Sequence, residues 1–115
     1  MSKRVDDVPL RDMLAYAQQT RQRMLGVERD IFEDVDTIRE SVAFNVLVIG
    51  EAASKVSPQL RAEHPEIPWL DIINMRHRIV HGYAFIDIEK LWYAATDGVA
   101  SLVPALERIL APRAP

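Results

Sequence analysis

The segment from residue 36 to residue 56 constrains the fold more than any other part of this chain. Apolar residues recur along it at the three- and four-residue spacing of an α-helix, and further apolar side chains widen this stripe. A helix that is apolar on nearly all sides needs cover on more than one side. We therefore expect a long central helix in a helical bundle, with a second copy of the chain as a candidate for part of the cover. The stripe and its extensions are Ile38, Val42, Val46, Ile49, Ala53, Val56, Phe44, Leu47 and Val48.

The N-terminal part of the chain predicts a second helix over residues 9–25. Its apolar residues form one stripe at helical spacing. Pro9 suits the first position of a helix, and Gly26 suits the position just past its end. A short helical turn is expected at residues 28–33.

The C-terminal half predicts two more helices and a helical turn at residues 59–63. One helix should run from Pro68 to Gly82. The other should begin at Asp87, a good N-cap residue. Pro104 should kink this last helix, because proline lacks a backbone donor and clashes with the preceding turn.

No segment alternates between apolar and polar residues as a half-buried strand does. The sequence therefore predicts an all-α, up-and-down bundle of four to five helices. The length of 115 residues suits one domain, 1–115, with flexible tails at 1–8 and 111–115. A composition that is 49% hydrophobic and 27% charged is typical of a globular protein.

Composition excludes several classes of function. The chain has no cysteine, which rules out a disulfide framework and thiolate chemistry. Residues 1–7 lack the apolar core of a signal peptide, and no apolar run approaches the roughly 18 residues of a membrane span. We expect a cytoplasmic protein. A net charge of −3 argues against a general nucleic-acid coat protein, but not against an enzyme that holds a few phosphates.

Residues 76–83, Arg-His-Arg-Ile-Val-His-Gly-Tyr, gather two arginines, two histidines and a tyrosine within eight positions. Arginine forks onto phosphate oxygens, and histidine exchanges a proton near neutral pH. Together they supply the groups that cleave a phosphodiester without a metal. The helix dipole alone also favours basic residues near a helix C-terminus, by about 0.3–1 kcal/mol. Composition therefore leaves chemistry and helix capping equally open.

The spacing within this motif allows two arrangements. Arg76 and His81 are five positions apart, about 140° around a regular helix. They share a site only if His81 lies in a distorted last turn before Gly82. Alternatively, His77 and His81 would bind a divalent metal from one helix face, but no HExxH pattern supplies the rest of such a site. We expect neither a metal nor a cofactor.

The pattern Arg76-x4-His81-x-Tyr83 resembles the Rx4HxY signature of the HepT-like toxins, within the HEPN superfamily of α-helical ribonucleases. Residues 49–53, Ile-Gly-Glu-Ala-Ala, resemble the IGEA segment of that family's long helix. The similarity also takes in Ile-Pro-Trp at 67–69 and the order of the helices, so it covers nearly the whole chain. His77 departs from the family pattern, in which Asn or Asp more often follows the arginine.

The resemblance implies a metal-independent endoribonuclease that acts on RNA as a homodimer, with the motifs of two subunits facing each other. It implies that His81 is the general acid and base and that Arg76 stabilises charge on the scissile phosphate. His77 would orient one of these groups or bind phosphate. Arg78 would contact the RNA backbone, unless it is only a solvated surface arginine.

The resemblance also implies a regulator. In the family's type VII toxin–antitoxin systems the antitoxin MntA, a minimal nucleotidyltransferase, transfers AMP onto the motif tyrosine, here Tyr83. The charged AMP would repel RNA. Tyr83 is otherwise a helix-end aromatic packed on Trp92 or Phe85. Glu51 either pairs with a motif arginine or faces solvent. The alternative function is a non-catalytic HEPN-like module that binds a nucleotide or the nucleotidyltransferase.

Overall fold

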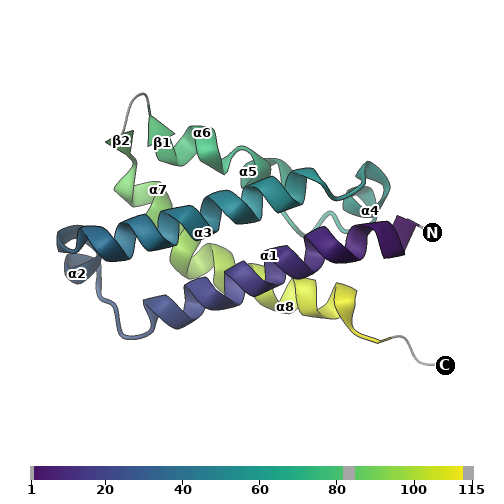
Figure 1. Cartoon of the computed structure of the whole chain (residues 1–115), viewed down its shortest axis with the longest axis horizontal. Coiled ribbons are helices and arrows are strands. Elements are labelled where there is room, and N and C mark those ends of the chain that lie inside the picture. The colour runs from purple at the N-terminus through teal and green to yellow at the C-terminus, as the bar shows by residue number, and fades with distance from the viewer. Residues whose placement is uncertain (1, 82–84, 113–115) are drawn as a thin grey trace.

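A computed structural model of the chain describes residues 2–81 and 85–112 and shows an elongated helical bundle of 49 × 30 × 20 Å (Figure 1). Helices α1 (Ser2–Met24) and α3 (Asp36–Ser54) lie side by side and are joined through the short α2 (Arg29–Asp34). The C-terminal α8 (Val99–Leu110) packs against α1. The all-α class predicted from the sequence is confirmed, and the long apolar segment forms the central helix α3.

Helix α1 begins earlier than the sequence predicted. Residues 2–8, expected as a tail, are helical, and Pro9 lies inside the helix. A buried carboxylate ties this first part of α1 to the bundle. Asp6 is fully buried and accepts hydrogen bonds from the backbone N–H and the hydroxyl of Ser57, at 2.8 and 2.7 Å. Ser57 in turn caps α4 (Pro58–Glu63). The two hydrogen bonds between Asp6 and Ser57 offset the backbone hydrogen bond that Pro9 removes from α1.

The helix predicted from residue 68 to 82 is divided. It forms α5 (Trp69–Ile73) and α6 (Met75–Ile79), and the chain then enters strand β1 (Val80–His81). This strand pairs antiparallel with β2 (Phe85–Ile86), with Val80 opposite Ile86. The expectation of no strand was therefore wrong. Val80 and Ile86 both pack against the core. If the helix continued through residue 82, the two side chains could not do so together.

The last helical segment is interrupted at a different place from the one predicted. Asp87 caps α7 (Ile88–Tyr93) as expected, accepting the Lys90 N–H at 3.1 Å. Between α7 and α8 lies a π-helical turn, η1 (Ala94–Gly98), whereas Pro104 lies within α8. Inside this turn the Thr96 hydroxyl donates to the Trp92 carbonyl oxygen at 2.7 Å. Such side-chain bonds compete with the helical hydrogen bonds and widen or bend a helix.

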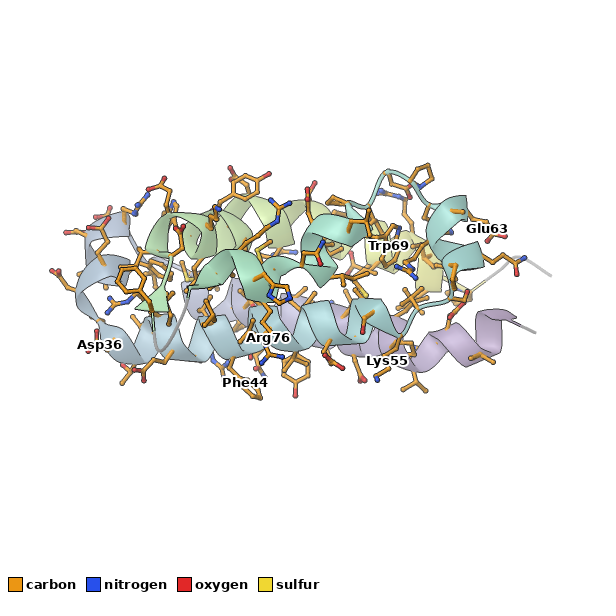
Figure 2. The ribbon with its side chains drawn as sticks, turned by 90° about the horizontal axis from the view of Figure 1, so that it is seen from above. Asp36, Phe44, Lys55, Glu63, Trp69 and Arg76 are labelled. Atoms are coloured by element: carbon orange, nitrogen blue, oxygen red, sulfur yellow. The ribbon has the colours of Figure 1, made fainter. Side chains whose placement is uncertain are left out.

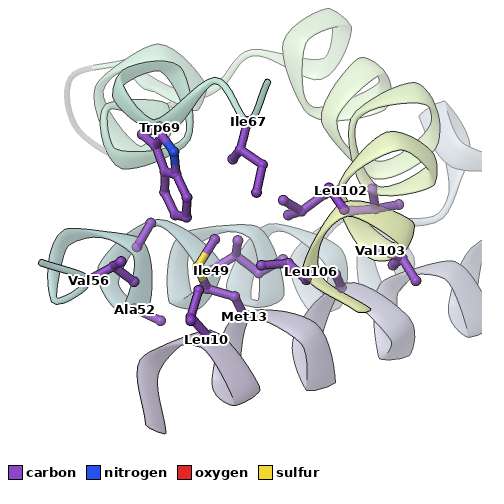
Figure 3. Packing of buried hydrophobic residues seen from close by; sticks show 14 of the residues in the cluster. Leu10, Met13, Ile49, Ala52, Val56, Ile67, Trp69, Leu102, Val103 and Leu106 are labelled. Carbon is purple, nitrogen blue, oxygen red and sulfur yellow. The ribbon is translucent and has the colours of Figure 1, made fainter. Parts of the chain in front are cut away.

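Two clusters of buried apolar side chains fill the bundle. The first lies among α1, α3 and α8 and includes Met13, Ile49 and Leu106 (Figure 3). The second lies under α6 and α7 and includes Ile79 and Leu91, both fully buried. Burial of a side chain of this size stabilises a fold by about 1.5–3 kcal/mol. Ile79 therefore holds the motif helix α6 down onto the core.

Two segments that carry the family resemblance have structural roles around α5. A Cβ atom placed on Gly50 would lie 2.7 Å from the backbone oxygen of Ile72, so α3 and α5 approach each other only because residue 50 is glycine. Trp69 is buried at the start of α5, and its indole N–H donates to the His64 carbonyl oxygen at 2.9 Å. Both contacts fix the helix that precedes the motif.

Candidate active site

Helix α6 carries the three basic residues that open the motif. Arg76, His77 and Arg78 are all exposed, while Ile79 below them is buried. Figure 2 looks onto this side of the molecule and labels Arg76. Within the described part of the chain, the side chains of Arg76 and His77 form no hydrogen bond or ion pair. Their charged and polar groups are therefore accessible to a ligand.

His81 lies in strand β1 rather than in the last turn of a helix, so that expectation was wrong. The helix ends at Ile79 because Val80 adopts extended backbone angles, φ −98° and ψ 109°. The 140° separation of a regular helix therefore does not apply to Arg76 and His81. Tyr83, the predicted modification site, lies outside the described residues, and only the backbone of His81 is described.

The structure does not support the metal site considered for His77 and His81 on one helix face, because the two residues do not share a helix. Over the described ranges of the chain, no group of three His, Asp or Glu residues is placed to hold a metal ion.

Arg78 forms an ion pair across the break between α5 and α6. One of its guanidinium nitrogens lies 3.0 Å from a carboxylate oxygen of Asp71, and both side chains are about half exposed. Exposed pairs of this kind stabilise proteins by only about 0–1 kcal/mol. A phosphate oxygen can therefore replace the Asp71 carboxylate at little energetic cost.

Glu51 is not paired with a motif arginine in this structure. It is exposed on α3, and its carboxylate lies 3.7 Å from the Lys55 ammonium one turn along the same helix. Of the two interpretations given for this residue, the structure shows the solvent-facing one.

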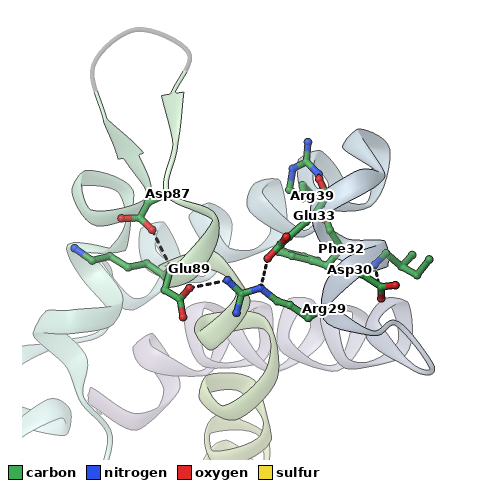
Figure 4. Close-up of polar contacts among 9 residues, drawn as sticks. Arg29, Asp30, Phe32, Glu33, Arg39, Asp87 and Glu89 are labelled. Atoms are coloured by element: carbon green, nitrogen blue, oxygen red, sulfur yellow. Dashed lines mark hydrogen bonds and ion pairs between the residues drawn. The ribbon is translucent and has the colours of Figure 1, made fainter.

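A polar contact near the motif was missed by the sequence reasoning. Arg29 on α2 binds Glu33 at 2.8 Å and Glu89 on α7 at 2.6 Å (Figure 4). Its guanidinium carbon also lies 5.6 Å from the Trp92 ring centroid. The hydrogen bond to Glu89 raises the pKa of Arg29, and the same bond lowers the pKa of Glu89.

This contact joins α2 to the helix that directly follows the β1–β2 hairpin, and it therefore helps to fix the base of the hairpin. The four-residue spacing of Arg29 and Glu33 was visible in the sequence. The partner 60 positions away was not.

The family model for ribonuclease HepT-like proteins matches residues 13–109, which include the whole motif and all of α3. This chain belongs to the ribonuclease HepT-like family. The predicted family and its enzyme class, an RNA-cleaving enzyme, are thereby confirmed.

Several curated HepT-like relatives are similar to the chain. "Probable ribonuclease HepT" of Thermococcus cleftensis is 32% identical over 54% of this chain, and the aligned part spans 56% of that protein. "Putative RNase MJ1216" and "Putative RNase MJ0125" of Methanocaldococcus jannaschii are 27% and 26% identical over 96% of this chain, and over 91% and 95% of their own lengths. No solved structure is a significant match. Among the described helices of this HepT-like chain, none is long and apolar enough to cross a bilayer.

Proposed function

We propose that this chain is a metal-independent endoribonuclease whose active site forms where the motifs of two identical subunits meet. The observation that carries the proposal is the position of Arg76. Within the described residues it is exposed and unpartnered on α6, and the same short segment leads directly into the strand that bears His81. In a HepT-like ribonuclease, an arginine that can bind phosphate and a histidine that can transfer a proton on one short segment support this proposal.

The chemistry of RNA transesterification explains why these residues suffice. The 2′-oxygen attacks the neighbouring phosphorus while a base removes its proton. An acid then protonates the 5′-oxygen as its bond to phosphorus breaks. His81 exchanges the protons, and Arg76 stabilises the negative charge that accumulates on the phosphate oxygens. His77 and Arg78 bind flanking phosphates.

A dimer supplies what one chain lacks. One subunit has a single His81, whereas base and acid act on opposite sides of the phosphorus, and a two-fold axis supplies a second His81 and a second Arg76. The apolar side of α3 supports such an interface. Phe44 is 60% exposed on α3, the helix against which α6 packs, and its ring meets the Tyr16 ring edge-on at a centroid distance of 6.4 Å (Figure 2).

We further propose that the chain is the toxin of a type VII system and that an MntA-like nucleotidyltransferase silences it at Tyr83. The tyrosine oxygen would attack the α-phosphorus of ATP, forming a new O–P bond as pyrophosphate leaves and the phenol proton passes to a base of the transferase. The AMP group would add negative charge to the motif, and this charge would repel the phosphates of the RNA.

The test is cleavage of an end-labelled RNA in excess EDTA by the wild type, His81→Ala, Arg76→Ala and the control Arg21→Ala, an exposed arginine on α1. We expect the wild type and the control to leave a 2′,3′-cyclic phosphate, and the two motif variants to be inactive yet folded and dimeric. Equal cleavage by all four proteins would place the activity elsewhere. No cleavage by wild type with unmodified Tyr83, checked by mass spectrometry, would favour the non-catalytic binding module.

A further inference from the structure

The β1–β2 hairpin places an aromatic side chain opposite the motif histidine. The register pairs Val80 with Ile86 and His81 with Phe85. Val80 and Ile86 pack against the core, and side chains alternate between the two faces of a strand. Phe85 therefore projects from the other face of the hairpin, where it is 66% exposed.

Phe85 differs from the other exposed aromatic side chains in having nothing that explains its exposure. Phe44 has a ring partner in Tyr16 and lies on the side of α3 proposed above for the subunit interface, and the exposed Tyr93 has a hydroxyl that water can solvate. Among the described residues, Phe85 takes part in no ring pair. Burial of a phenyl ring would stabilise the fold, so folding alone does not explain why the ring of Phe85 lies in solvent.

The backbone on either side of Phe85 is also anchored. The backbone N–H of Asp87 donates to the Ile79 carbonyl oxygen at 2.6 Å and closes the base of the hairpin. Helix α7 follows at once and is fixed to α2 through the Arg29–Glu89 ion pair. The backbone that carries Phe85 is therefore anchored, a few residues along the chain from the exposed basic side chains of α6.

RNA cleavage by its own 2′-hydroxyl needs such a surface. The attacking 2′-oxygen, the phosphorus and the leaving 5′-oxygen must lie in line, and a regularly stacked strand does not provide this alignment. A nucleotide at the scissile bond must leave the stack, and proteins hold unstacked bases against aromatic rings. Base–aromatic stacking tolerates any sequence, because every base has a π face.

We propose that Phe85 is the stacking platform for an unstacked nucleobase adjoining the scissile phosphate. This inference rests on the proposed ribonuclease function. Arg76, His77 and Arg78 hold the phosphates, and Phe85 holds the base that has left the stack.

The test compares Phe85→Ala and Phe85→Trp with Tyr93→Ala, a control that removes a similarly exposed aromatic ring outside the hairpin. The substrates are a short fluorescein-labelled single-stranded RNA and the same RNA with an abasic ribose beside the cleavage site. On the intact RNA we expect Phe85→Ala to lose about tenfold in kcat/KM, Phe85→Trp to retain activity, and the control to match wild type. On the abasic RNA, wild type and Phe85→Ala should be equally slow.

A binding measurement separates this inference from the proposed function. Fluorescence anisotropy with a 2′-deoxy version of each oligonucleotide reports stacking even if no cleavage is seen. Wild type should bind the intact strand about tenfold more tightly than the abasic strand, and Phe85→Ala should not distinguish them. Equal discrimination by both proteins would overturn the proposal. Loss of the dimer on Phe85→Ala, seen by sedimentation, would also overturn it and assign Phe85 to a subunit interface.

Discussion

Replacement of Gly50 by alanine tests whether the close approach of α3 and α5 is a requirement of the fold. Gly50 lies inside α3, where alanine is ordinarily the better helix former by about 1 kcal/mol. The added Cβ would, however, lie 2.7 Å from the Ile72 backbone oxygen. Real Cβ atoms essentially never come so close to a backbone atom, and Ile72 can yield only if α5 moves.

The two effects have opposite signs, and their magnitudes decide the result. Overpacking costs about 1–3 kcal/mol when the backbone must shift. This exceeds the gain in helix propensity, so we expect Gly50→Ala to lower the free energy of unfolding by about 1 kcal/mol. Gly98→Ala is the matched control, because Gly98 also has helical backbone angles and its Cβ would lie 3.5 Å from the Tyr93 oxygen, an ordinary contact. That variant should be neutral or more stable.

Urea denaturation followed by circular dichroism measures both variants, and a loss of 1 kcal/mol corresponds to a decrease of about 4 °C in melting temperature. The Gly50 variant should also lose ribonuclease activity in proportion to the displacement of α5, which leads into α6. If both alanine variants were stabilised by similar amounts, the argument from the α3–α5 contact would be refuted.

Three further predictions follow from polar contacts. Asp71→Asn should release Arg78 and tighten binding of single-stranded RNA up to about fivefold at low salt, measured by anisotropy, whereas unchanged affinity would show that Arg78 does not reach the RNA. Asp6→Ala removes a buried acceptor of two hydrogen bonds and should lower the free energy of unfolding by about 2–3 kcal/mol in urea, with a change below 0.5 kcal/mol counting against the contact. Because Arg29 lowers the folded-state pKa of Glu89 below the ordinary 4.5, the pair stabilises the fold above that pH and ceases to do so as the pH falls through the lowered value. The melting temperatures of wild type and Glu89→Gln should therefore differ at pH 7 and converge as the pH falls below the lowered pKa of Glu89; a constant difference would refute the linkage.

Local sequence signals predicted the parts of the fold that depend on local spacing. The apolar repeat of residues 36–56 identified α3, and Asp87 identified the start of α7. The five-residue spacing of Arg76 and His81, with the glycine-containing segment upstream, was enough to identify the family. These features are encoded within a few helical turns, so no knowledge of tertiary contacts was needed.

The errors arose where distant residues decide the local structure. Residues 2–8 are helical because Asp6 meets Ser57, 51 positions away. The chain leaves the helix at Val80 because that residue gains a strand partner in Ile86. The spacing of apolar residues within one segment does not reveal a hydrogen-bond or strand partner that lies outside that segment.

The junction between α6 and β1 affects how the motif can evolve. Had both motif residues stood on one helix, inserting a residue between them would have rotated the second by about 100° and destroyed the site. Here the segment between them changes from helix to strand at Val80. Extra residues can be accommodated at such a junction as a bulge or a longer turn while the ends keep their positions. The number of residues between arginine and histidine is thus not tied to the helical repeat, and we expect an insertion at Val80 to disturb the site less than one inside α6.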